Sequence, residues 1–344
     1  MKNSLRSASA VAFAALLAFA FNPYAQAADH GIGTNVPGVG FSPQPPQYFD
    51  PLSASDQELN DYGFPSRPDS QIQPEAYASW KRAMSTVKER ILPELKLTDR
   101  FHEPAQQVVV EPGGVQTSNW SGEGVTTKPT NFDSPDSIHA ATIAYIVPVA
   151  NQAFGKCTGT WVYSATLVGI DGYGGNDVLE AGTNQNALCT GQVVGQYNAW
   201  IEWYPLPEMQ IVNFPVSPGD TISIAIWASS ATRGNAFVLN QTTGQSASFT
   251  VAAPKGVQLA GNSAEWAIDR PAIGGKSATL TNYTSTYVSA CFAWHVLDYS
   301  TILTPGDPSS IQFNMVDDNQ LPISSPYTLG TSAFQLIEEG SPRQ

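Results

Sequence analysis

The sequence predicts an all-β fold, an antiparallel sandwich or barrel over residues 118–344, preceded by a proline-rich, partly helical region over 28–117. From about Ser118 onward, β-branched and aromatic runs such as "TWVYSATLVGID", "AWIEWYP" and "DTISIAIWAS" alternate with Gly, Asn, Asp and Ser clusters. No helical pattern separates these runs, which favours antiparallel pairing. Residues 28–117 carry 11 of the 26 prolines, a composition typical of a linker or pro-region.

Residues 1–27 have the pattern of a secretory signal peptide. Lys2 and Arg6 precede an apolar run over 8–21, and "AQA" at 25–27 fits a small-residue cleavage site. The run is too short for a membrane anchor, and no later segment has 18 consecutive apolar residues. We therefore expect a secreted protein, extracellular or periplasmic, without a stable membrane anchor.

The net charge of −13 is unevenly distributed. Residues 118–344 hold 7 Lys and Arg against 17 Asp and Glu, whereas residues 76–102 hold 6 against 3. An acidic surface argues against nucleic acid as a partner. It suits a protein that works at low pH, where few salt bridges can be lost, although an ordinary acidic secreted domain fits the charge equally well.

Three cysteines are present, Cys157, Cys189 and Cys291. In an oxidising compartment this number predicts one disulfide and one free thiol, and the sequence leaves all three pairings open. No C-x-x-C motif occurs, so we expect neither a metal nor another cofactor.

Two short helices are expected within residues 28–117. Ser55 and Glu58 form a capping-box pattern, and Gly63 is placed to end the first helix. The second has apolar residues at spacings of 3, 4, 3 and 4, at Tyr77, Trp80, Met84, Val87 and Ile91. Basic residues surround that apolar face, so the helix is interpreted as an intramolecular lid on the acidic domain. A helix that packs on the domain, or binds a membrane surface, is the alternative.

Two turns join expected strands into hairpins. "NAFVLNQTTGQSASFTV" predicts a hairpin with Thr243 and Gly244 at its turn. The glycine-rich "DGYGGN" at 171–176 lacks the lysine of a phosphate-binding loop and is interpreted as a second hairpin turn.

Three expected strands each carry a glutamate: Glu180, Glu202 and Glu265. Side chains alternate between the faces of a strand, so Glu202 shares a face with Trp200, whereas Trp203 lies on the other. Aromatic and small residues flank the three carboxylates, as in a substrate groove with shifted acid strengths. The alternative is three independent surface or ion-paired glutamates, and alternation alone does not decide between them.

Other catalytic patterns fit less well. Residues 118–344 contain only His139 and His295, with no HExxH motif and no G-x-S-x-G motif. The three N-x-S/T sequons, at Asn119, Asn240 and Asn282, suit surface loops.

Seven motifs in order resemble those of the glutamic peptidases, or eqolisins: "SNWSG", "VGIDG", "LEAGT", "YNAWIEWYP", "GDTISI", "NQTTGQ" and "NSAEWAIDRP". The resemblance extends from Ser118 to Trp294. It implies a sandwich of two curved, concanavalin-like antiparallel sheets with the site on the concave side. It also implies secretion with a pro-segment and cleavage of proteins at acidic pH. We expect a monomer that acts on protein or peptide substrates.

The resemblance casts Glu265 as the general base. The family's catalytic Gln corresponds to Glu180, a family Trp to Leu167, and a family Asp to Asn198. Five further residues are assigned to substrate contact or support: Trp120, Asp171, Trp200, Glu202 and Trp203.

A carboxyl at Glu180 can replace a Gln amide only as a protonated donor. Two nearby carboxyls cannot both ionise cheaply, so Glu180 and Glu265 are expected to hold one proton between them over an acidic range. This hypothesis predicts activity at acidic pH that is lost near neutrality.

Two alternatives and one regulatory hypothesis accompany this interpretation. Two glutamates in an aromatic groove also fit a glycoside hydrolase, or a non-catalytic module that binds peptide or carbohydrate. In the peptidase interpretation, the basic segment over 80–100 blocks the acidic groove as an intramolecular inhibitor, and acid triggers self-cleavage before Ser118.

Overall fold

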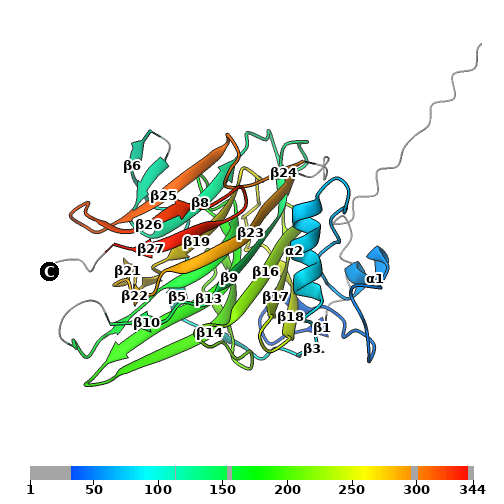
Figure 1. Ribbon diagram of the computed structural model, residues 1–344, viewed down its shortest axis with the longest axis horizontal. Coiled ribbons are helices and arrows are strands. Elements are labelled where there is room, and N and C mark those ends of the chain that lie inside the picture. Colours follow the sequence, from blue (N-terminus) through cyan, green and yellow to red (C-terminus); the bar gives the residue numbers. More distant parts are fainter. Residues whose placement is uncertain (1–31, 113, 153–156, 296–300, 340–344) are drawn as a thin grey trace, which may run out of the picture.

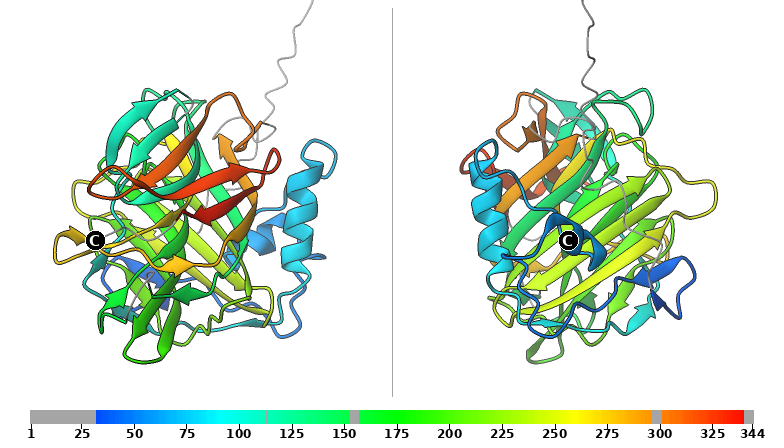
Figure 2. Two further views of the ribbon diagram at one scale, coloured as in Figure 1. Left: turned by 60° about the vertical axis from the view of Figure 1, so that its left-hand side comes forward. Right: turned by 90° about the vertical axis from the view of Figure 1, so that its right-hand side faces the viewer.

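The computed structural model describes residues 32–112, 114–152, 157–295 and 301–339. The predicted signal peptide and its cleavage site lie outside the described residues. Within these ranges the chain forms two packed β-layers with two helices, α1 (Asp56–Asp61) and α2 (Pro74–Met84), beside one of them (Figures 1 and 2). Neither helix has the length and apolar character needed to span a bilayer. The predicted antiparallel sandwich is confirmed.

The first layer is called the site sheet. Its strands run in the order β4 (Leu95–Leu97), β15 (Met209–Ile211), β14 (Val193–Tyr204), β13 (Val178–Cys189), β12 (Ala165–Ile170), β19 (Ser263–Asp269), β8 (Trp120–Thr126) and β25 (Ser310–Val316), all antiparallel. Short strands extend it at β11 (Trp161–Val162), β7 (Gly114–Thr117) and β6 (Gln107–Glu111).

The second layer is called the back sheet. It contains β1 (Ile32–Gly33), β2 (Val39–Phe41), β18 (Gln245–Ala252), β17 (Arg233–Asn240), β16 (Thr221–Ser230), β9 (Ile138–Ile146), β23 (Thr286–His295), β27 (Phe334–Glu338) and β26 (Pro322–Thr328), with β3 (Glu89–Arg90) and β24 (Ile302–Leu303) at its margins. Pairing of β25 with β26 joins the layers. Two small sheets comprise β10 (Ala150–Asn151) with β22 (Asn282–Tyr283), and β5 (Arg100–Phe101) with β20 (Ala272–Ile273) and β21 (Lys276–Ser277).

The main core lies between the two layers. Alternate residues such as Leu179 and Ile201 of the site sheet face Ile143 and Ile224 of the back sheet. Trp203 is fully buried in this core. Because alternation places the odd-numbered residues 179, 201 and 203 inward, the even-numbered neighbours on β13 and β14 point to the outer side of the site sheet.

Both predicted hairpins are present. β17 and β18 pair around a turn in which Gly244 has a φ of +84°, a conformation that glycine adopts without strain. Residues 171–177 connect β12 to β13, which are paired neighbours. The expected first helix is α1, whose capping box between Ser55 and Glu58 is formed.

The second helix is shorter than its apolar spacing predicts. It ends at Met84, so Val87 and Ile91 are not helical. The hydroxyls of Ser85 and Thr86 donate to carbonyls of the last turn, and the Ile91 amide donates to the back sheet at Ser246. The chain therefore leaves the helix because its backbone groups find partners in β18.

α2 packs on the outer face of the back sheet, away from the three glutamates (Figure 1). Trp80 and Met84 join an apolar cluster with Trp227, Phe237 and Trp294 of that sheet. The interpretation of this helix as a lid was therefore wrong. The helix packs on the domain, which was the stated alternative.

The structure also decides the cysteine pairing and the burial of two of the sequons. Cys157 and Cys189 form the disulfide, which leaves Cys291 as a buried thiol. The sequons at Asn119 and Asn240 are not on the surface, because both side chains are buried and their amides donate to neighbouring oxygens.

Candidate functional site

Glu265, Glu180 and Glu202 lie in one row across the outer side of the site sheet. Strand register pairs Gly169 of β12 with Glu265 on one side and with Glu180 on the other, and pairs Glu180 in turn with Glu202. Directly paired residues project from the same face of a sheet. The three carboxylates therefore share one surface, the site face, which we define by this row.

Gly169 leaves an opening between the two expected catalytic carboxyls. A Cβ atom at this position would lie 3.1 Å from Glu265 Oε2 and 3.8 Å from Glu180 Cβ. Because neighbouring strands lie about 4.8 Å apart, the backbones of Glu180 and Glu265 are separated by about 10 Å. Any larger residue at 169 would fill the space that both carboxyls border.

Glu265 is held by backbone donors of the β12–β13 turn. The amides of Gly172 and Tyr173 donate to its two oxygens at 3.3 and 2.9 Å. Burial raises the pKa of Glu265 to about 7, against the effect of these donors. Asp171 fixes the same turn: its carboxylate accepts from three consecutive amides, those of residues 260–262, at 2.5–2.8 Å. Asp171 thus supports Glu265 through the turn.

Glu180 has a different environment. It is fully buried, and neither carboxyl oxygen has a hydrogen-bond partner among the described residues. Burial raises its pKa well above the usual value, and the adjacent charges of Glu202, Asp269 and Glu265 raise it further. A buried carboxyl with no donor to stabilise its charge is most stable when protonated.

The segment over 98–106 covers the site face. The backbone of Thr98 and Arg100 pairs with that of Glu208, and the Ala105 amide donates to Gly172. Asn119 accepts from the Gln106 amide and donates to carbonyls of 103 and 104. The covering segment therefore crosses from β15 over β14 to the turn beside Glu265.

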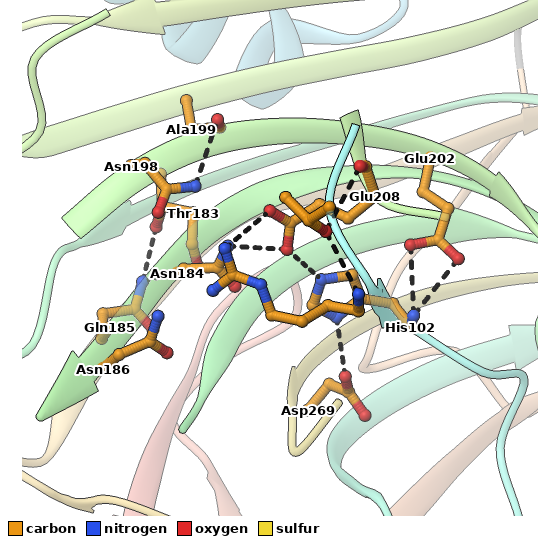
Figure 3. A network of polar contacts seen from close by, with 12 residues as sticks. His102, Thr183, Asn184, Gln185, Asn186, Asn198, Ala199, Glu202, Glu208 and Asp269 are labelled. Carbon is orange, nitrogen blue, oxygen red and sulfur yellow. Dashed lines mark hydrogen bonds and ion pairs between the residues drawn. The ribbon is translucent and has the colours of Figure 1, made fainter. Parts of the chain in front are cut away.

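His102, in this segment, points into the site face (Figure 3). Its ring stacks on Trp200, with centroids 3.8 Å apart and planes 5° from parallel. Nδ1 lies 2.8 Å from Asp269 and Nε2 lies 3.1 Å from Glu208. The His102 amide donates to both oxygens of Glu202. One residue of the segment thus engages three buried carboxylates.

The charges of this cluster are mutually dependent. Burial alone would lower the pKa of His102, but Asp269 and Glu208 raise it to about 9. Burial would raise the pKa of Glu208, but His102 and Arg100 lower it below its usual value; the Arg100 guanidinium lies 3.3 Å away. For Asp269 burial outweighs His102, and its pKa is raised. At neutral pH, an imidazolium is therefore bound between acidic groups.

The expected tryptophans divide between the two faces. Trp120 and Trp200 belong to an apolar cluster on the site face, together with Leu167. Trp203 lies in the core between the layers, so it can support the sheet but does not face a groove. Asn198 is buried on β14, four residues before Glu202 (Figure 3).

Sequence reasoning missed His102 and Glu208. Both lie outside the long strands, and only the folded segment brings them together. The charged run "RFHEP" at 100–104 was the available signal. Within the described ranges no cluster of three or more His, Cys, Asp or Glu side chains has a metal-binding arrangement.

Comparisons with known proteins agree with this architecture. Residues 118–312 match the model of the Peptidase A4 family. Aspergillopepsin-2 of Aspergillus niger is 30% identical over 168 residues, 44% of this chain and 56% of the relative. Scytalidopepsin B of Scytalidium lignicola is 36% identical over 75 residues, 22% of this chain and 29% of the relative. The chain thus spans about half the length, or less, of these curated relatives.

A solved structure of scytalido-glutamic peptidase with a transition state analog inhibitor has the same fold. The match has a TM-score of 0.52 and 20% sequence identity, and it covers 64% of this chain and 98% of that chain.

Proposed function

Because the chain belongs to the peptidase A4 family, we propose that it is a secreted endopeptidase that hydrolyses proteins at acidic pH with Glu265 and Glu180. The observation that supports this most directly is the position of both carboxyls on one face, on either side of Gly169. Gly169 places no side chain between them. The proposal includes a signal sequence over 1–27 and a monomeric state.

Glu265 is the general base in this proposal. It takes a proton from the water as the water oxygen bonds to the peptide carbonyl carbon, and it later gives that proton to the departing amine. Glu180, protonated, donates its O–H to the oxyanion of the tetrahedral intermediate, the role of an amide donor. The carbon–nitrogen bond then breaks, and a carboxylic acid and an amine are released.

The environments of the two carboxyls support this division of roles. Glu265 accepts two backbone hydrogen bonds, which stabilise its ionised form. Glu180 has no such donors and is paired with Glu202. The proposal therefore places the proton on Glu180. When the covering segment leaves, water reaches Glu265 and lowers its pKa from about 7 toward the acidic range.

The covering segment is the inhibitor in this proposal. The part that reaches the site face is 98–106 rather than the basic helix. His102 and Glu208 attract each other while one is protonated and the other ionised. The contribution of Glu208 is lost as pH falls below its usual range, because its folded-state pKa is lowered. The proposed acid trigger is this loss at Glu208, which opposes the effect of the raised pKa values of Glu202 and Asp269. Self-cleavage is expected before Ser118.

The test is digestion of denatured casein, with polysaccharides in parallel, after an acid shift. Wild type should produce peptide fragments and Glu265→Gln none. Glu123→Gln is the matched control, because Glu123 is equally buried on β8 but pairs with Trp266, off the carboxylate row. Casein cleavage by Glu265→Gln at the wild-type rate, or fragments from polysaccharide alone, would contradict the peptidase proposal.

A further inference from the structure

The His102 ring lies in a pocket that the site sheet itself builds. Trp200 forms its flat wall, and Glu208 and Asp269 provide its acidic ends. Asn184 orients Glu208 by donating to Oε2 at 2.8 Å. We call these four residues the acidic pocket. All four are buried, and they lie on β13, β14, β19 and the turn before β15.

The covering segment bonds to the site face near both ends of the carboxylate row. His102 contacts Glu202 at one end of the row, and the Ala105 amide contacts Gly172, whose own amide binds Glu265, near the other. Residues 103 and 104 lie between these two contacts, and their carbonyls accept from the Asn119 side chain, just before β8. A substrate that follows this path would present its scissile bond to the C-terminal side of the residue in the acidic pocket.

We propose that the acidic pocket, once the segment has left, binds a positively charged substrate side chain on the N-terminal side of the scissile bond. This inference rests on the proposed function and specifies its substrate class: proteins and peptides with Lys, Arg or His at one position.

The charges that face the pocket favour a cation. Glu202, Glu208 and Asp269 all contact His102, and Glu180 is the strand partner of Glu202. Arg100, which balances Glu208, leaves with the segment. Arg270 follows Asp269 but directs its guanidinium to Ser118 and Asp318.

A neutral side chain would leave buried acidic groups without a charged partner. A cation would restore two charge-assisted hydrogen bonds and stack on the indole. The same cation would lower the pKa of Glu208, as His102 does now.

The experiment profiles cleavage sites in a mixed peptide library digested by the acid-treated full-length chain. We expect Lys, Arg and His to be enriched about ten-fold over Gln at one position N-terminal to the cut, a factor that corresponds to the difference between a hydrogen bond to a charged group and a neutral one. Glu208→Gln and Asp269→Asn should each reduce this ratio toward one. Glu123→Gln, remote from the pocket, is the control and should keep the wild-type ratio.

The outcomes separate the two proposals. Cleavage with no cationic preference, or a preference that both pocket variants retain, would overturn the acidic pocket while the peptidase function stands. Absence of cleavage of any peptide or protein by wild type would overturn the proposed function and the pocket's role with it.

Discussion

Replacement of His102 by Gln should loosen the covering segment at neutral pH. The rise in the pKa of His102 from 6.5 to about 9 reflects preferential binding of the imidazolium. A tenfold change in proton affinity is worth about 1.4 kcal/mol, so the interaction contributes about 3 kcal/mol. Because the folded-state pKa is raised, this contribution is complete below pH 6.5 and is lost as pH rises through about 9.

Hydrogen exchange of the His102 and Ala105 amides measures this directly, since both donate across the site face. At pH 7, exchange corrected for intrinsic rates should be about a hundredfold faster in His102→Gln, the factor that corresponds to about 3 kcal/mol. The difference should shrink toward pH 9.

His139→Gln is the control, because His139 stacks on Phe132 of its own neighbourhood and is not part of the site face. Asp269→Asn should weaken the same pH dependence while it retains the imidazole. Equal exchange in wild type and His102→Gln between pH 6 and 9 would refute the electrostatic account of the covering segment.

Three further predictions concern the catalytic row and its support. Glu180→Gln should keep activity and extend it upward in pH, because an amide donor cannot lose its proton; a folded but inactive variant in the casein pH profile would contradict the donor role. Gly169→Ala should lower kcat at least about a hundredfold in a folded protein, since its Cβ would lie 3.1 Å from Glu265 Oε2; wild-type kcat would show that the opening is not used. Asp171→Ala should lower the free energy of unfolding by about 3 kcal/mol, because three amides lose their acceptor; urea denaturation measures this, and an unchanged midpoint would contradict it.

Much of the site face followed from alternation along single strands. The two-residue period alone placed Glu202 and Trp203 on different faces of their strand, and it did the same for Glu180 and Leu179. What alternation could not supply was register between strands far apart in the sequence. Pairing of Gly169 with both Glu180 and Glu265 brings the row together, and it depends on the packing of whole layers.

The wrong expectations share one cause, the influence of tertiary contacts on local patterns. Apolar spacing continued to Ile91, but hydrogen bonds to β18 ended the helix at Met84. The sequence motif at Asn119 is typical of a surface loop, but the Asn119 amide is bound to the covering segment. The run "RFHEP" alone could not show the role of His102, because its partners are 100 or more residues away in the chain.

Strands contributed by residues 32–117 are built into both layers: β2 and β3 lengthen the back sheet, while β4 and β7 lengthen the site sheet. A single cut before Ser118 would sever the covalent link without dissolving these pairings. Release of the covering segment would then need a second cut upstream of it, so that maturation would remove an internal piece of the chain rather than its N-terminal part. The remaining pieces would stay associated as one nicked protein, and N-terminal sequencing of that protein would identify more than one N-terminus.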